Sequence, residues 1–286
     1  MTKAPIDVLF ITGLGRSGST LLSRLLGAIA GVDNLGEFAS YWTVPSLFSR
    51  NLPCGCGQSM EACVRWGKWG DVGQIATDGE SRRLFNNLTV FRRGRATEKA
   101  RRRLGEDLGR RYSRAALETG ARLLVDASKR PAVAIAIAAA SNVNVYIAHL
   151  VRDPQAVAAS RAQPKDYLDQ IPAWHIGPRW SAVNLAAERV GGTAPGYTLI
   201  RYEDLVNKPQ ESLKQILDEL SITGFDAPNF VNGRLDVGVQ HSIAGNPDKL
   251  GDTVITIRKV AETRPRIRGA ILVALTTAPV RKRYGY

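Results

Sequence analysis

The sequence has few cysteines and lacks any long apolar run. Only three cysteines occur among 286 residues, and all fall in one short segment, at Cys54, Cys56 and Cys63. Such a small and odd number excludes a disulfide framework and favours a reducing compartment. The longest apolar run, Ala132 to Ala140, is nine residues long, far short of the ~20 that a membrane-spanning helix needs. We therefore expect a cytoplasmic protein without a transmembrane segment.

The chain also lacks the features of a secretion signal and of a disordered or fibrous protein. Its first strand-like run begins at Ile6, which leaves no room for a charged segment, an apolar stretch and a cleavage site. With 44% hydrophobic and 23% charged residues, its composition is that of a globular protein with a sizeable core. We expect one domain over residues 1–286, with irregular segments at about 36–95 and about 225–260.

Acidic residues are scarce relative to basic ones. Lysine and arginine number 39 against 26 aspartates and glutamates, which gives a net charge of +13. Much of the excess lies between Arg82 and Arg114, and one interpretation is a docking surface for nucleic acid, acidic lipid or an anionic substrate. We favour an amphipathic helix over residues 96–119 whose arginines face water, because apolar residues recur every four positions. These residues are Ala100, Leu104, Leu108, Tyr112 and Ala116.

Strand-like and helical patterns alternate along the chain. Four runs rich in β-branched residues predict strands at 7–12, 122–126, 143–151 and 197–202. An apolar stripe from Leu21 to Ile29 predicts one helix, and Pro131, Pro154 and Pro209 are placed to begin three more. Strands that alternate with helices indicate βαβ units. The predicted fold class is therefore α/β, a three-layer sandwich with a mainly parallel central sheet and a P-loop-like phosphate-binding turn.

The most informative stretch joins the first strand to the first helix. It reads Gly13-Leu-Gly-Arg-Ser-Gly-Ser-Thr20. Backbone N–H groups are unpaired in the first turn of a helix, and the helix dipole adds a positive end there, so phosphate oxygens bind at such a turn. The stretch therefore predicts an anion site.

Two known kinds of phosphate loop fit this stretch only in part. Gly13, Gly15 and Gly18 match the G-x-G-x-x-G fingerprint of NAD(P)-dependent oxidoreductases. That fingerprint requires a second strand that ends in an acidic residue, whereas Glu37 follows a polar stretch, 30–36, that is not predicted to be a strand. In the nucleoside triphosphate loop a lysine binds the terminal phosphates, but Ser19 occupies its position.

A strand followed by Gly-Arg-Ser-Gly-Ser-Thr-Leu-Leu resembles the phosphosulfate loop of the sulfotransferases, which use 3′-phosphoadenosine 5′-phosphosulfate (PAPS) as donor. The resemblance implies transfer of a sulfuryl group to a hydroxyl of a small-molecule acceptor, such as a natural product or a carbohydrate. The residues that would bind the 5′-phosphosulfate are Gly15, Arg16, Ser17, Gly18, Ser19 and Thr20. An NAD(P)-dependent oxidoreductase and an arginine-rich nucleic-acid-binding protein are the alternatives.

Two further stretches fit the same family. Residues 145–161 read as an apolar strand that ends at Arg152 and a helix that carries Ser160, which resembles the family's 3′-phosphate motif. An arginine at a strand end can make a two-pronged, charge-assisted contact with phosphate. Arg258 is similar to a C-terminal basic residue that contacts the same phosphate, although Val260 replaces the expected glycine.

The resemblance also implies the catalytic residues. Lys129 would stabilise charge on the leaving oxygen, with Arg16 acting from the loop. Glu37 matches the glutamate base of the bacterial and tyrosyl-protein members, and it would take the proton of the acceptor hydroxyl. If Glu37 is not the base, His241 and His175 are the candidates.

The three cysteines could be zinc ligands. Structural zinc sites have four ligands, however, and no histidine lies near the cysteines in the sequence. We therefore interpret them as a thiol cluster in a packed loop, and we expect that the reaction needs no metal. The predicted partner is a small hydroxylated molecule and not a nucleic acid.

Overall fold

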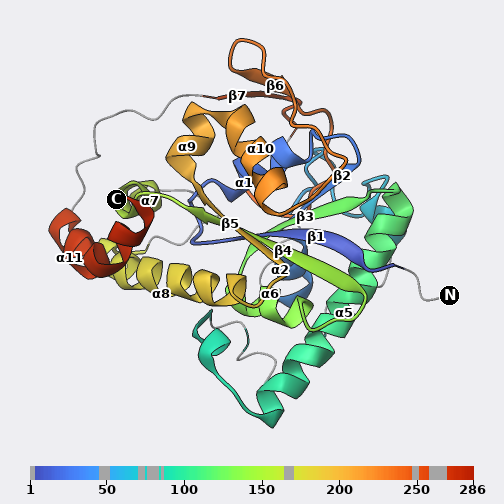
Figure 1. The fold of residues 1–286 in the computed structure, drawn as a ribbon. Helices are drawn as coiled ribbons and strands as arrows, with labels where there is room; N and C mark the ends of the chain where they lie inside the picture. The colour runs from blue at the N-terminus through green and yellow to red at the C-terminus, as the bar shows by residue number, and fades with distance from the viewer. Residues whose placement is uncertain are drawn as a thin grey trace.

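The computed structural model describes residues 4–44, 52–69, 75, 84, 87–163, 171–246, 251–257 and 269–286. Within this part of the chain, a five-stranded parallel sheet lies between layers of helices (Figure 1). The strand order is β2-β3-β1-β4-β5. The strands are β1 (Ile6–Thr12), β2 (Val32–Gly36), β3 (Leu123–Lys129), β4 (Val143–Val151) and β5 (Gly196–Arg201). The predicted α/β fold class is confirmed.

The central strand, β1, shows why these runs form strands. Residues Val8 to Ile11 are fully buried, because β3 and β4 pair with β1 on either side and helices cover both faces of the sheet. A strand covered on both faces carries apolar side chains at successive positions rather than at alternate ones. Burial of each large apolar side chain contributes ~1.5–3 kcal/mol.

Different helices cover the two faces of the sheet (Figure 1). One face is covered by α1 (Ser19–Leu26), α9 (Tyr202–Asn207) and α10 (Pro209–Glu219). The other face is covered by α2 (Phe38–Thr43), α5 (Arg95–Thr119), α6 (Pro131–Ile137) and α8 (Ala173–Gly191). A third apolar cluster joins α8 to α7 (Pro154–Ala162), α11 (Ala270–Arg281) and the end of β4.

Most predicted elements agree with the structure. The strand predicted over 143–151 coincides with β4, and helices begin at Pro131, Pro154 and Pro209 as predicted. Proline suits the first helical position, because its missing N–H would have no helical partner there. The sequence did not predict the long helices α8 and α11, since Pro178 and Pro279 interrupt their patterns.

The interpretation of residues 30–36 as a stretch without a strand is wrong. Residues Val32–Gly36 form β2, at one edge of the sheet. Its polar side chains have partners from distant segments: the Asp33 carboxylate accepts two hydrogen bonds from Arg65, and the Asn34 amide donates to Gln240. Polar residues with such partners are compatible with an edge strand. As a consequence, Glu37 directly follows a strand.

The two segments predicted to be irregular contain short elements. The first includes α2 and the 3₁₀ turns Trp66–Trp69 and Asn87–Phe91. The second includes β6 (Arg234–Asp236) and β7 (Val254–Thr256), which form an antiparallel hairpin. Turns of this length carry too few residues to show a periodic pattern.

Helix α5 confirms the amphipathic pattern of the basic segment. Its apolar stripe is largely buried and most of its arginines are exposed. Arg101 departs from the pattern, because its buried guanidinium donates to the backbone oxygens of Thr89 and Arg92. Among the described helices, none combines the length and the apolar character that crossing a membrane requires.

Candidate active site

The carboxyl ends of four adjacent strands bring the predicted site residues to one edge of the sheet. β1 leads into Gly13, β2 into Glu37 and β4 into Arg152, while β3 ends at Lys129. The loop after β1 also lies where the chain changes direction across the sheet, because β3 is on one side of β1 and β4 on the other. Ligands of open α/β sheets bind at such a switch point.

The loop between β1 and α1 follows a backbone path that requires glycine. Gly13 has a φ of +134°, and a side chain there would overlap the carbonyl oxygen of Leu150. Gly18 has a φ of +99°, and a side chain there would overlap the ring of Tyr202. Arg16 has a φ of +81°, which costs a non-glycine residue ~1–3 kcal/mol. Strain of this kind is concentrated at binding sites.

Ser17 lies just before α1, and within the described part of the chain neither its hydroxyl nor the start of the helix has a side-chain partner. Ser17 is 2% exposed, and its hydroxyl has no hydrogen-bond partner among the described residues. Gly18 occupies the N-cap position, and no side chain in the described part of the chain caps the helix. An unpaired buried hydroxyl costs ~1–3 kcal/mol. An anion at this turn would accept hydrogen bonds from Ser17 and from the backbone N–H groups that begin the helix.

The two predicted phosphate motifs contact each other. Nε of Arg16 donates to Oγ of Ser160 at 3.0 Å, and Nη1 of Arg152 donates to the carbonyl oxygen of Arg16 at 3.1 Å. The Arg152 guanidinium also lies over the ring of Tyr202, 4.3 Å from its centroid. Nε of Arg152 has no hydrogen-bond partner among the described residues. Two guanidinium groups therefore share one site, and Tyr202 is part of its wall.

Glu37 and Lys129 form an ion pair at neighbouring strand ends. Nζ of Lys129 lies 2.5 Å from Oε1 of Glu37, and each side chain is 19% exposed. Lys129 has a φ of +67°, and its Nζ also donates to the carbonyl oxygen of Ala127 at 2.9 Å. The pair places a half-buried carboxylate and a half-buried ammonium group at the same edge as the glycine loop.

Buried residues of β3 hold the turn that carries Glu37. Oδ2 of Asp126 accepts hydrogen bonds from the backbone N–H of Ala39 at 2.8 Å and from the hydroxyl of Tyr112 at 2.6 Å. Burial raises the pKa of Asp126, whereas hydrogen bonds from Ser128, Tyr112 and Ala39 act in the opposite direction. The sequence did not identify these positioning residues, because a polar residue in a strand carries no signal of its own.

Arg130 is a further cation near Glu37 that the sequence did not single out. Burial lowers the pKa of Arg130, the charge of Glu37 raises it, and the charge of Arg179 lowers it again. The edge beside Glu37 has more positive than negative charge, which suits an anionic ligand.

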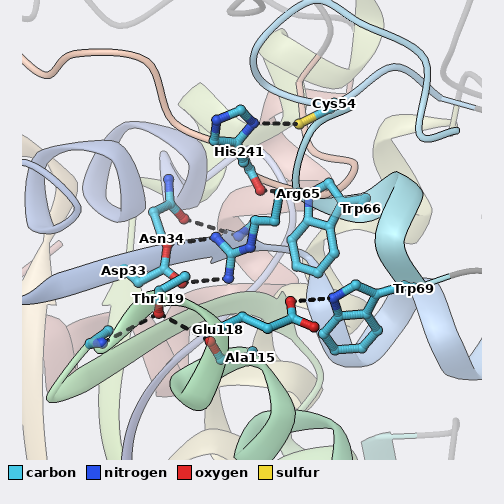
Figure 2. Close-up of polar contacts among 12 residues, drawn as sticks. Asp33, Asn34, Cys54, Arg65, Trp66, Trp69, Ala115, Glu118, Thr119 and His241 are labelled. Atoms are coloured by element: carbon cyan, nitrogen blue, oxygen red, sulfur yellow. Dashed lines mark hydrogen bonds and ion pairs between the residues drawn. The ribbon is translucent and has the colours of Figure 1, made fainter. Parts of the chain in front are cut away.

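The remaining predicted residues lie in different surroundings. Gly15 lies in the loop beside the guanidinium of Arg161, and Arg258 lies outside the described residues. The His241 ring is next to cysteines, with Nδ1 3.9 Å from Sγ of Cys54 (Figure 2). His175 is on α8.

A pocket adjoins the start of α1. Ser19 and Thr20 are the first two residues of that helix. The pocket lies between α1, the cysteine segment and the segment that carries His241, and its lining includes Thr20, Arg24, Cys56, Gln240, Ser242 and Asn246. Thr20 therefore belongs both to the predicted donor loop and to the pocket wall.

The strand order argues against a dinucleotide site, even though β2 exists. In dinucleotide-binding folds, the strand with the acidic residue is adjacent to β1. Here β3 lies between β1 and β2, which displaces the carboxylate by one strand spacing, ~5 Å.

Comparison with known proteins gives a family and a fold. A family profile described as "Sulfotransferase family" matches residues 8–227. The sulfotransferase domain from the Synechococcus PCC 7002 olefin synthase has a similar structure, with a TM-score of 0.58 and 21% identity over 99% of this chain and 96% of that chain. For the sulfotransferase domain from the curacin biosynthetic pathway, the TM-score is 0.46 and the identity 21%, over 78% of this chain and 76% of that chain. No curated protein matches the chain.

Proposed function

Because the chain belongs to the sulfotransferase family and is an enzyme of that kind, we propose that it transfers a sulfuryl group from PAPS to a hydroxyl of a small-molecule acceptor. The observation that carries the proposal is the shared site at the ends of β1 and β4, where Arg16 contacts Ser160 and Arg152 contacts the backbone of Arg16. A donor with phosphate groups at both ends needs cations from both motifs in one place.

The residues of this site fit the donor. The hydroxyl of Ser17 and Nε of Arg152 lack partners among the described residues, and the start of α1 is uncapped there. The 5′-phosphosulfate would be held by Gly15, Arg16, Ser17, Gly18, Ser19 and Thr20. The 3′-phosphate would be held by Arg152 and Ser160, with Arg258 as a further contact. When bound, PAPS supplies the sulfuryl group and leaves as adenosine 3′,5′-bisphosphate.

Glu37 is the proposed base, which assigns the chain to the branch of the family with a glutamate in this role. Its side chain is 19% exposed, so an acceptor hydroxyl can approach it. General-base catalysis contributes ~10²–10⁴-fold in rate. Lys129 and Arg16 supply positive charge where the leaving oxygen becomes negative. The ion pair between Glu37 and Lys129 keeps the base and the leaving-group cation at one edge of the sheet.

The proposed acceptor is a hydroxylated natural product or carbohydrate. Two observations support this choice. The pocket that includes Thr20 adjoins the donor loop, and the solved domain with a similar fold over nearly the whole chain comes from an olefin synthase.

The test is turnover with PAPS and a panel of phenols, sugars and hydroxylated natural products, followed by mass spectrometry of the products. We expect a sulfonated product and an equal amount of adenosine 3′,5′-bisphosphate, and only when enzyme, PAPS and acceptor are all present. Hydride transfer from NADH to any member of the panel would contradict the proposal. Pre-incubation with adenosine 3′,5′-bisphosphate should inhibit the reaction competitively with PAPS.

A further inference from the structure

Three thiols and one imidazole meet at one point outside the donor loop. Cys54, Cys56 and Cys63 lie in segment 52–69, and His241 comes from a distant segment after β6. One potential ligand atom from each of the four residues lies within 4.8 Å of the other three. Figure 2 shows the His241 ring directed toward Cys54. We call these four residues the Cys₃His cluster.

The spacing of these atoms matches the corners of a small tetrahedron. Sγ of Cys63 lies 3.6 Å from Sγ of Cys54, 3.9 Å from Sγ of Cys56 and 3.3 Å from Nδ1 of His241. Around tetrahedral zinc, Zn–S bonds of ~2.3 Å and Zn–N bonds of ~2.0–2.1 Å place two sulfurs ~3.8 Å apart and a sulfur and a nitrogen ~3.6 Å apart. The two S–S separations, 3.6 and 3.9 Å, lie on either side of the first value. The S–N separations from Nδ1 of His241, 3.3 Å to Cys63 and 3.9 Å to Cys54, lie on either side of the second.

We propose that the Cys₃His cluster binds one structural Zn²⁺ ion. Three thiolates and an imidazole are soft and borderline ligands, which favour zinc over Ca²⁺ or Mg²⁺. Four protein ligands close the tetrahedron, so no position is left for water or substrate, as in structural zinc sites. The fold supplies the histidine that the neighbouring sequence lacks, since His241 lies 178 residues after Cys63.

Backbone hydrogen bonds shape the cysteine segment around the cluster. The N–H of Cys54 donates to the oxygen of Gln58, and the N–H of Gly57 donates back to the oxygen of Cys54, both at 2.8 Å. Gly57 has a φ of +86°, which allows this tight turn. The N–H of Cys63 donates to the oxygen of Ser59 at 2.9 Å. These bonds fix the backbone of the cysteine segment, and the fold thereby brings the three thiols together.

Two contacts fasten the His241 segment to the cysteine segment on either side of the cluster. The N–H of Gly55 donates to the oxygen of Ser242 at 2.8 Å, and Nε1 of Trp66 donates to the oxygen of His241 at 2.7 Å. The cysteine segment is in turn fastened to β2 by the pair between Arg65 and Asp33 (Figure 2). The cluster thus lies where three parts of the chain join.

A metal in the cluster would affect the candidate active site only by fixing the position of the segment beside Glu37. Ile243, two residues after His241, pairs with the end of β2: its N–H donates to the oxygen of Leu35 at 2.9 Å, and its oxygen accepts from the N–H of Glu37 at 2.8 Å. Cys56 and Ser242 also line the pocket beside Thr20. Zinc would therefore stabilise the segment that flanks Glu37 without touching the reacting groups.

The test is the metal content of the full chain purified without chelators, measured by elemental mass spectrometry. We expect about one zinc per chain. Replacement by Co²⁺ should give the visible bands of a tetrahedral site and a sulfur-to-cobalt charge-transfer band. C63S should lower the zinc content well below one per chain. H175A, which removes a histidine outside the cluster, should leave the zinc content unchanged.

A second pair of variants separates ligation from folding. H241A should release its zinc to a chromogenic chelator much faster than the wild type. H241C restores a fourth ligand, so its zinc should be released slowly, as in the wild type. Chelation of the wild type should lower Tm, and Zn²⁺ but not Mg²⁺ should restore it. If C63S does not fold, titration of the chelated wild type with Co²⁺ gives the same answer.

Three results would overturn the zinc site. They are protein without zinc whose three thiols all react in the native state, a disulfide within the cluster, and stoichiometric iron in place of zinc. None of these results bears on the donor loop, so the zinc site can fail while the proposed sulfotransferase activity stands.

Discussion

The carboxyl edge of the sheet differs from its interior in how its buried polar atoms are paired. At the edge, Ser17 and Arg152 each have a buried polar atom without a hydrogen-bond partner among the described residues. Inside the sheet, on β4, each ring nitrogen of His149 has a hydrogen-bond partner. Nδ1 of His149 lies 2.8 Å from the hydroxyl of Tyr197, and Nε2 lies 3.0 Å from Oδ1 of Asn184. Burial lowers the pKa of His149 to about 4, although Asn184 and Glu188 act in the opposite direction.

We interpret the difference as one between a group that stabilises the fold and groups that are proposed to bind the donor. Buried polar groups in folded proteins are normally hydrogen-bonded, and each exception calls for an explanation. Among the described residues, unpaired buried atoms also occur away from the site, as at Nε of Arg65 and Nδ2 of Asn184, but at the strand ends they coincide with backbone strain at Arg16 and Lys129. Substitutions of the polar and charged side chains at the edge should therefore change rate or ligand binding, whereas substitution of His149 should change stability alone.

The largest effect is expected at the base. Glu37→Gln should lower kcat ~10²–10⁴-fold, because an amide cannot take the proton of the acceptor. Affinity for adenosine 3′,5′-bisphosphate should be retained. Product formation at saturating PAPS measures the loss, and Glu211→Gln, on an exposed side chain of α10, is the matched control. Full turnover by Glu37→Gln would contradict the assignment of Glu37 as the base and would leave His175 as the candidate.

The next effect concerns the shape of the loop. Gly18→Ala should destabilise the fold by ~2–4 kcal/mol, because a φ of +99° strains alanine and the new methyl overlaps the Tyr202 ring. Gly120→Ala is the control, since Gly120 has a φ of +67° with nothing within 4 Å, and it should cost ~1–2 kcal/mol. Urea unfolding of both variants measures the difference. Equal losses would mean that Tyr202 does not constrain the loop.

A substitution of Arg152 sharpens the comparison further, because it should weaken binding of the 3′-phosphate and not of the 5′-phosphate. Arg152→Ala should lower the affinity for adenosine 3′,5′-bisphosphate by about 10- to 150-fold. This loss is the equivalent of ~1.5–3 kcal/mol for a charged hydrogen bond. The affinity for AMP, which lacks the 3′-phosphate, should fall much less. Calorimetric titration of both ligands measures the ratio, with Arg189→Ala on the exposed side of α8 as control. A similar loss for both ligands would remove Arg152 from the 3′-phosphate site.

The smallest effect is expected at His149 and only at low pH. Between pH 6.5 and about 4, the unfolded chain binds a proton that the folded protein excludes, so stability falls as the pH decreases. The free energy of unfolding should fall by ~2 kcal/mol between about pH 7 and about pH 5. His149→Gln should lack this part of the pH dependence and should bind adenosine 3′,5′-bisphosphate normally. Urea unfolding of both proteins at the two pH values tests it, and parallel curves would contradict it.

The sequence predicted the parts of the site that are contiguous in the chain. The glycine loop combines a strand, a turn and a helix within a few residues, and Arg152 and Ser160 lie in one strand–helix unit. In both cases the pattern of residues within one strand–helix unit is enough to predict on which element each side chain lies. The fold class could be predicted for the same reason, since buried parallel strands consist of uninterrupted apolar runs.

The parts that could not be predicted depend on contacts across the fold. β2 was missed because its polar residues find partners on other segments, such as Arg65 for Asp33. Tyr202 and Asp126 act through neighbours that are remote in the sequence, Gly18 and Ala39. The Cys₃His cluster is the extreme case, because its histidine and its cysteines meet only after both irregular segments have packed against the edge of the sheet.

The most direct test of the proposed function is the Tm of the wild-type protein with adenosine 3′,5′-bisphosphate, compared with AMP, ATP and NAD at the same concentration. A ligand that binds the folded state raises Tm by an amount that grows with the logarithm of the ratio of its concentration to its Kd. We predict that the bisphosphate raises Tm clearly more than the other three, because only it places phosphates at both Arg16 and Arg152. Equal shifts with all four ligands would contradict the assignment of the two phosphate sites.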